Sequence, residues 1–204
     1  MRQGPRAARG LKVGLLGGSF DPAHSGHAHV AETALRRLGL HAVWWLVTPQ
    51  NPLKTRSSPL EARMASARKV ARSPHMIVTD IETRLGTSYT FDTLAALHHR
   101  YPAVQFVWLM GADNLDGFAR WRNWQDIARM APICVVSRPG AGPKARLGAL
   151  ARVFWNHRVR LEDARALPGR RAPAWLYIPA RWNPQSSTML RAQAARAAAA
   201  PVRI

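Results

Sequence analysis

The amino-acid sequence, 204 residues long, predicts an α/β fold: one open parallel sheet with helices on both of its faces. Two observations support this prediction. Short apolar segments bounded by turn residues alternate with segments of helical character, which is typical of strands buried on both faces of a parallel sheet. Apolar residues make up 47% of the chain, enough to form the core of one domain of this length. The expected architecture is a single Rossmann-like domain.

Six short apolar segments are predicted to be buried strands. They are residues 11–16, 42–48, 75–81, 104–110, 133–137 and 174–178. The fifth contains the one cysteine of the chain, Cys134. A lone cysteine cannot form an internal disulfide, so we expect an inert core thiol in a reducing cytoplasm.

Helices are predicted between these strands. Apolar residues recur at helical spacing from Val30 to Leu38, and Gly39 ends the stripe. A second helix should begin at Ser58, with Ser58 as its cap, Pro59 in the first helical position and Glu61 closing a capping box.

The remaining segments complete the predicted domain. A third helix is expected over residues 90–100, and a last one near 186–187. Residues 141–173 are rich in Arg, Gly and Pro, so we expect them to form an excursion before the last strand. Residues 1–10 are expected to be a mobile basic arm without the apolar region of a secretory signal. The rest of the chain, 11–204, would then form the single predicted domain.

Basic residues far outnumber acidic ones: 30 Lys and Arg face 11 Asp and Glu, a net charge of +19. Such a balance implies anionic partners. The arginines are dispersed, and we interpret many of them as solvated helix surface, among them Arg63, Arg68, Arg72, Arg191 and Arg196. No nucleic-acid motif is recognisable and no apolar run is long enough to span a bilayer. We therefore expect neither nucleic acid nor membrane as partners, and a basic nucleic-acid-binding protein is the alternative from a different class.

The most informative segment is the loop over residues 17–27, Gly-Gly-Ser-Phe-Asp-Pro-Ala-His-Ser-Gly-His, which follows the first predicted strand. Ligands bind at this edge of open parallel sheets. Gly17 and Gly18 would let the backbone approach a bulky anion, and the free N–H groups of a helix that starts at the end of the loop would bind phosphate. His24 and His27 are three residues apart, so both rings can donate hydrogen bonds to one phosphate.

Other chemistries fit this loop less well. The patterns Gly-x-Gly-x-x-Gly and Gly-x4-Gly-Lys-Ser/Thr are absent, which disfavours a dinucleotide oxidoreductase and a P-loop NTPase. Asp21, His24 and His27 could belong to a metal cluster, but no matching set of Cys and His follows. No protein metal site is therefore expected. A purely structural turn is the remaining alternative.

The loop Gly-Gly-Ser-Phe-Asp-Pro-x-His-x-Gly-His resembles the phosphate motif of the His-x-Gly-His nucleotidyltransferase superfamily, and more specifically that of bacterial nicotinate-nucleotide adenylyltransferases. Five further segments resemble motifs of that family in the same order, from Gly17 to Arg191. They are Thr-Pro-Gln-Asn-Pro-Leu-Lys at 48–54, Thr-Ser-Tyr-Thr-Phe-Asp-Thr-Leu at 87–94, Gly-Ala-Asp at 111–113 with Trp121 and Trp124, Ser-Arg-Pro-Gly at 137–140, and Ser-Ser-Thr with Arg191 at 186–191. Six motifs in one order are a far more specific signal than any one alone.

The resemblance implies an enzyme of NAD biosynthesis that transfers the adenylyl group of ATP to nicotinate mononucleotide, giving nicotinate adenine dinucleotide and pyrophosphate. Its implied partners are these small molecules, and a homo-oligomer is left open. The mononucleotide phosphate has a second pKa near ~6 and needs no general base at pH 7. Mg²⁺ is expected to arrive with ATP and not in a dedicated protein site. The alternative enzyme is a phosphopantetheine adenylyltransferase or a cytidylyltransferase, which shares the His-x-Gly-His loop but not the segments at 87–94 and 111–124 together.

The resemblance also implies site residues on the ATP side, which combine two helix starts with further polar groups. They are Gly17, Gly18, Ser19, Phe20, His24, His27, Asp113, Arg138, Ser187, Thr188 and Arg191. The implied catalytic residues are His24, His27, Lys54 and Arg191, with His27 on the transferred phosphate. Asp113 is suited to ribose hydroxyls. Two roles are open for Arg138: it could contact the adenine or a phosphate of ATP, or it could lie in a surface turn without ligand contact.

The mononucleotide side implied by the resemblance combines a basic loop residue with two aromatic segments: Lys54, Thr87, Ser88, Tyr89, Trp121 and Arg122. Trp121 offers a flat face to the nicotinate ring, and Thr87 or nearby N–H groups could hold its carboxylate. A place in the core is the alternative for Trp121, and it is the favoured interpretation for Tyr89, Trp108 and Trp124. Two residues depart from the family pattern: Arg122, where a histidine or aromatic residue commonly stands, and Gln185, where an apolar residue does.

Overall fold

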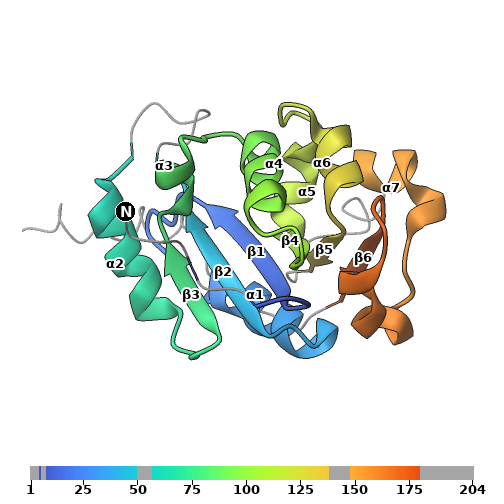
Figure 1. Ribbon diagram of the computed structural model, residues 1–204, viewed down its shortest axis with the longest axis horizontal. Coiled ribbons are helices and arrows are strands. Elements are labelled where there is room, and N and C mark those ends of the chain that lie inside the picture. Colours follow the sequence, from blue (N-terminus) through green and yellow to red (C-terminus); the bar gives the residue numbers. More distant parts are fainter. Residues whose placement is uncertain (1–4, 6–7, 50–56, 138–147, 180–204) are drawn as a thin grey trace, which may run out of the picture.

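The computed structural model describes residues 5, 8–49, 57–137 and 148–179. These residues form a sheet of six parallel strands in the spatial order β3-β2-β1-β4-β5-β6. The strands are β1 (Lys12–Gly18), β2 (Ala42–Val47), β3 (Met76–Thr79), β4 (Gln105–Gly111), β5 (Ile133–Val136) and β6 (Trp175–Ile178). Figure 1 shows them side by side, from β3 at one edge to β6 at the other. The predicted Rossmann-like parallel sheet is confirmed, and each strand ends within two residues of its predicted position.

Helices fill the connections between the strands. They are α1 (Ser25–Leu38), α2 (Leu60–Val70), α3 (Ile81–Leu85), α4 (Thr90–Arg100), α5 (Ala112–Phe118), α6 (Trp124–Met130) and α7 (Ala149–Val153), with 3-10 helices η2 (Trp155–His157) and η3 (Leu161–Gly169). The predicted third helix, 90–100, is confirmed as α4. Within the described ranges, no helix combines the length and the apolar character needed to cross a membrane.

Two cores lie on opposite faces of the sheet. Neighbouring residues of a strand point to opposite faces, and Trp44 and Trp45 of β2 accordingly lie in different cores, each at most 1% exposed. Residues of α1, α2 and η3 cover the Trp45 face, and residues of α3 to α7 cover the Trp44 face. Fully burying one large apolar side chain contributes roughly 1.5–3 kcal/mol, so these two layers supply the main stabilisation of the sheet.

The ends of α1 follow from its sequence. Gly39 ends the helix in the left-handed region, with φ of 62°, and its N–H donates to the carbonyl of Leu35. A residue with a side chain would be strained there. The predicted end of the first helix is therefore confirmed.

The start of α2 differs from its prediction. The helix begins at Leu60, Pro59 occupies the cap position in an extended conformation with ψ of 144°, and no side chain caps the helix. The backbone N–H of Ser58 instead donates to Oδ2 of Asp21 at 3.1 Å. The predicted capping box of Ser58 and Glu61 is wrong, because the extended Pro59 moves the first helical turn one residue along the chain.

The expected excursion before the last strand is confirmed from residue 148 onward. Phe154 enters the core on the Trp44 face, whereas Leu167 of η3 enters the opposite core. The indole Nε1 of Trp175 donates to the carbonyl of Phe154 at 2.7 Å. The excursion therefore contributes to both cores before the chain joins the edge of the sheet as β6.

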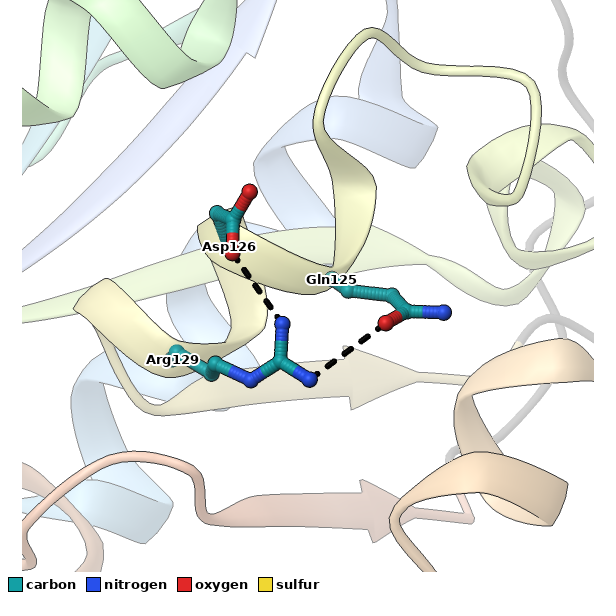
Figure 2. Close-up of polar contacts among 3 residues, drawn as sticks. All are labelled: Gln125, Asp126 and Arg129. Atoms are coloured by element: carbon teal, nitrogen blue, oxygen red, sulfur yellow. Dashed lines mark hydrogen bonds and ion pairs between the residues drawn. The ribbon is translucent and has the colours of Figure 1, made fainter.

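Arginine side chains occupy both expected and unexpected positions. On α6, Arg129 lies 3.0 Å from Asp126 and 3.3 Å from Oε1 of Gln125 on the exposed surface (Figure 2), where such pairs contribute only about 0–1 kcal/mol. Arg68 is also exposed, as the surface interpretation expects. Arg63 contradicts that interpretation, because only 2% of it is exposed.

Candidate active site

The strand order places the predicted loops at one edge of the sheet. β1 lies between β2 and β4, so the chain leaves β1 toward one side of the sheet and later crosses to the other. Open parallel sheets bind ligands at the carboxyl ends of the strands where this reversal occurs. The loop after β1 and the residues after β4 meet there, since Leu16 of β1 pairs with Leu109 of β4 just before both strands end. Asp113 lies in the exposed first turn of α5 at this edge.

Gly17 and Gly18 are the last residues of β1 and serve close packing. A Cβ atom at Gly17 would lie 2.6 Å from the indole ring of Trp108, and one at Gly18 would lie 3.3 Å from the ring of Phe20. The approach of this backbone to an anion stays a prediction, and packing within the protein is a second reason for glycine at both positions. Side chains of the protein, Trp108 above all, occupy the space that a larger residue would require.

Phe20 holds the loop in an uncommon backbone conformation. Its φ is 47°, in the left-handed region that costs a residue with a Cβ roughly 1–2 kcal/mol. The ring is 1% exposed, with centroids 5.0 Å from His27 and 5.2 Å from Trp45. Burial of the ring stabilises the strained backbone, and such strain clusters at binding sites.

His24 is the N-cap residue of α1, and backbone N–H groups set the tautomers of the His24 and His27 rings. The Nδ1 atom of His24 accepts a hydrogen bond from the N–H of Gly26 at 3.1 Å, and Nδ1 of His27 accepts one from the N–H of His24 at 3.2 Å. An Nδ1 atom that accepts from a backbone N–H cannot hold a proton, so each neutral ring has its proton on Nε2. The ring centroids are 3.9 Å apart. The predicted proximity of the two rings is confirmed, and each ring has an Nε2–H donor.

The segments expected to bind the mononucleotide also lie together. The guanidinium of Arg122 stacks over the ring of Tyr89 at 5.0 Å, and its Nη1 lies 3.9 Å from Oδ2 of Asp92. Arg122 therefore joins two segments that are about thirty residues apart in sequence. Tyr89 is 40% exposed, so the interpretation of Tyr89 as a core residue is wrong. Ser88 is likewise exposed.

The tryptophans divide between core and surface. Trp108 is 2% exposed and belongs to the core, as expected. Trp124 is partly buried and packs edge-on against Phe118 and Phe154. Trp121 is also partly buried, with its ring centroid 6.1 Å from Trp108 and 5.3 Å from Phe118. Its partial exposure is compatible with a ligand contact, which stays a prediction.

A buried carboxyl group that the sequence analysis missed lies beneath the 87–89 segment. Glu82 is 3% exposed, and the hydroxyl of Thr93 lies 3.0 Å from its Oε1 and 2.9 Å from the hydroxyl of Thr87. The N–H of Thr87 donates to the carbonyl of Glu82 at 2.9 Å. Burial raises the pKa of Glu82 to about 7, although hydrogen bonds from Thr93 and Thr48 act in the opposite direction. The Glu82 carboxyl therefore keeps its proton to a higher pH than an exposed glutamate does.

This raised pKa predicts how the stability of the protein depends on pH. Between the ordinary value of 4.5 and about 7, the folded chain binds more protons at Glu82 than the unfolded chain does, so the free energy of unfolding should fall as pH rises. The Glu82→Gln variant should lack this pH-dependent part of the free energy of unfolding, which amounts to about 3 kcal/mol at most.

Urea denaturation of wild type and Glu82→Gln at several pH values from about 5 to 8 measures the difference. The comparison removes contributions common to both proteins, such as that of His98, whose pKa burial lowers. Glu32→Gln, on the exposed surface of α1, is the control. If the difference in the free energy of unfolding between wild type and Glu82→Gln stays constant from about pH 5 to 8, the prediction is contradicted.

Five predicted site residues lie outside the described residues: Lys54, Arg138, Ser187, Thr188 and Arg191. Their roles stay predictions, as does the effect of Gln185. Among the residues that the structure describes, no three His, Cys, Asp or Glu side chains come together as metal ligands would. The backbone N–H groups and imidazole rings of the loop after β1 are donors that suit phosphate oxygen atoms.

Known proteins share this sequence and fold. The family model described as Cytidylyltransferase-like matches residues 15–193. The chain is 54% identical over 183 residues to a probable nicotinate-nucleotide adenylyltransferase of Cereibacter sphaeroides and 55% identical over 183 residues to one of a Caulobacter species, in both cases over 89% of this chain and 97% of the relative. The structure of Plasmodium falciparum nicotinic acid mononucleotide adenylyltransferase complexed with NaAD has the same fold, with a TM-score of 0.66 and 16% identity over 89% of this chain and 83% of that one.

Proposed function

The chain belongs to the nicotinate-nucleotide adenylyltransferases of the cytidylyltransferase-like family, and from this membership we propose how its residues perform the reaction. An enzyme of this family transfers the adenylyl group of ATP to nicotinate mononucleotide. An oxygen of the mononucleotide phosphate attacks the α-phosphorus of ATP, the bond from that phosphorus to the bridging β-phosphate oxygen breaks, and pyrophosphate leaves. The products are nicotinate adenine dinucleotide and pyrophosphate.

The protein's task is to hold two polyanions in line. The attacking phosphate has a second pKa near ~6, so at pH 7 it is largely dianionic and needs no general base. The site must offset the repulsion between the substrates and stabilise the charge that grows on the leaving pyrophosphate. Positioned N–H and cationic donors do both.

The observation that supports the phosphate assignment is the pairing of His24 and His27. Because both Nδ1 atoms accept backbone N–H groups, each neutral ring carries its proton on Nε2, and an Nε2–H group is the kind of donor that suits a phosphate oxygen. The first turn of α1 contains no acidic residue, so the positive end of the helix dipole is not offset there. We assign the ATP phosphates to these rings and to the backbone of Gly18, Ser19 and Phe20, with His27 on the transferred group.

The outgoing pyrophosphate requires further donors. We assign it to Ser187, Thr188 and Arg191, whose hydroxyl and guanidinium groups suit phosphate oxygens. Lys54 would reach a substrate phosphate as a mobile point charge. Arg138 would contact adenine or phosphate.

The mononucleotide would bind on the other side of the reacting phosphorus. We assign the nicotinate ring to the face of Trp121 and its carboxylate to the N–H and hydroxyl groups of the 87–89 segment. Arg122 would provide a positive charge on the same side of the site. Asp113 would accept hydrogen bonds from ribose hydroxyls of the ATP, since a carboxylate is an acceptor only.

Trp121→Ala tests this orientation of the two substrates. The variant should raise KM for nicotinate mononucleotide by roughly tenfold to a hundredfold, because stacking on an aromatic ring contributes about 1–3 kcal/mol, while KM for ATP stays nearly unchanged. Steady-state kinetics with each substrate varied in turn measures both values. Trp155→Ala, which removes a 69% exposed tryptophan on η2, is the matched control. Weaker ATP binding with an unchanged mononucleotide KM would place Trp121 on the adenine side.

A further inference from the structure

Arg63 of α2 is a buried cation bound to backbone carbonyl groups from three segments. It is 2% exposed. Its Nε donates to Ser58 at 2.8 Å, its Nη1 to Ser19 at 3.0 Å and to Thr48 at 2.6 Å, and its Nη2 to Pro49 at 2.7 Å. The planar guanidinium with its fixed donors thus joins the loop after β1, the residues after β2 and the start of α2.

The charge of Arg63 persists despite its burial. Desolvation lowers the pKa of the guanidinium, and the nearby carboxylate of Asp21 opposes that effect. Arginine stays protonated in proteins even when its pKa is lowered. A lysine could not replace it fully, because an ammonium group has three donors on one atom and cannot span four carbonyl groups in a fork.

The bond to Ser19 determines where a loop N–H points. The carbonyl of Ser19 and the N–H of Phe20 belong to one planar trans peptide, so they point in opposite directions. Since the carbonyl is directed at Arg63, the Phe20 N–H is directed away from it. This peptide lies in the loop that we assign to the ATP phosphates.

The bonds to Thr48 and Pro49 act on a second loop. Both residues follow β2 and lead toward Lys54, and the N–H of Thr48 donates to the carbonyl of Gly18 at 3.1 Å. One side chain therefore ties the ATP loop to the beginning of the segment assigned to a substrate phosphate. A shift of either loop must break hydrogen bonds to the same buried charge.

We propose that Arg63 is a positioning residue of the reaction, which orients the Ser19–Phe20 peptide and fixes the relative position of the two loops that hold the substrates. The proposal rests on the proposed function of those loops. Because misplacement of reacting groups by about 1 Å can cost about a hundredfold in rate, the effect of losing this tie should appear in catalysis and ATP affinity beyond any loss of folded protein.

Two variants test the proposal. Arg63→Lys retains the charge without the fork and should remain folded, with kcat at least about tenfold lower and a higher Kd for MgATP. Arg63→Ala should regain part of its activity in low millimolar guanidinium chloride, but not in equal concentrations of sodium chloride or urea. Arg68→Ala, an exposed position on the same helix, is the matched control and should be unchanged. Circular dichroism and thermal unfolding of each variant give the folded fraction to which activity is normalised.

The outcomes separate this proposal from the proposed function. A folded Arg63→Lys with wild-type kcat and wild-type Kd for MgATP overturns the positioning role, as does loss of activity only in proportion to the unfolded fraction. If wild type forms no dinucleotide, the proposed function fails, while the MgATP Kd values of wild type and Arg63→Lys still test whether Arg63 orients the ATP loop.

Discussion

His27→Ala should lower kcat for dinucleotide formation by on the order of 10² to 10³, equivalent to about 3–4 kcal/mol of lost transition-state stabilisation. The Nε2–H of His27 is fixed as a donor by the bond between its Nδ1 and the N–H of His24, and alanine has no group that could replace it. The effect should fall on kcat more than on KM, because charge on the transferred phosphate grows as the bond to pyrophosphate breaks.

Stability should change less than activity in this variant. His27 is partly exposed, and loss of its cap bond to α1 should cost about 1 kcal/mol. His99→Ala, at an exposed position in the last turn of α4, is the matched control for removal of an imidazole. Rapid-quench or steady-state measurement of pyrophosphate release gives kcat for both variants. Near-full kcat in folded His27→Ala would show that His27 is not the donor to the transferred phosphate.

Excess EDTA should lower pyrophosphate release by more than about a hundredfold, because a divalent cation on the phosphate oxygens is worth several kcal/mol of charge stabilisation. We propose that Mg²⁺ enters as part of the MgATP substrate and is held by phosphate oxygens and water. The backbone and imidazole N–H groups of the loop after β1 would contact phosphate oxygens directly.

The origin of the metal dependence is tested on the protein without ATP. If Mg²⁺ belongs to the substrate, EDTA should leave the thermal unfolding midpoint of the substrate-free protein unchanged, and added Mg²⁺ should restore turnover fully. Full turnover in EDTA would refute the requirement. A large drop of the unfolding midpoint in EDTA would instead point to a metal bound by the protein itself.

The sheet could be predicted from sequence because each strand is buried on both faces. Such strands are short continuous apolar runs, as in β2 with its adjacent Trp44 and Trp45, and they stand out between helical segments. The loop after β1 could be predicted for the same reason: its position after a strand and before a helix is itself a binding signal. The contact between Gly17 and Trp108 could not be predicted from the sequence, because Trp108 belongs to another strand.

Arg63 and Glu82 show why the rest was missed. Arginine beside alanine on a helix is usually solvated, and burial of Arg63 depends on carbonyl groups of Ser19, Thr48 and Pro49 that meet only in the folded chain. A signal was present, because Leu60, Met64 and Ala67 recur at helical spacing and position 63 lies on the same helical face. Glu82 was missed because residues 75–81 were assigned wholly to a strand, whereas the chain turns into α3 at Ile81.

The choice of acceptor is the central claim, and parallel assays of pyrophosphate release with MgATP test it most directly. We expect kcat/KM to be highest with nicotinate mononucleotide and roughly tenfold to a hundredfold lower with the amide mononucleotide, whose NH₂ group would leave donors of the 87–89 segment unmatched at about 1–3 kcal/mol each. 4′-Phosphopantetheine should give no release above background. A higher kcat/KM with the amide or with 4′-phosphopantetheine than with nicotinate mononucleotide would contradict the account.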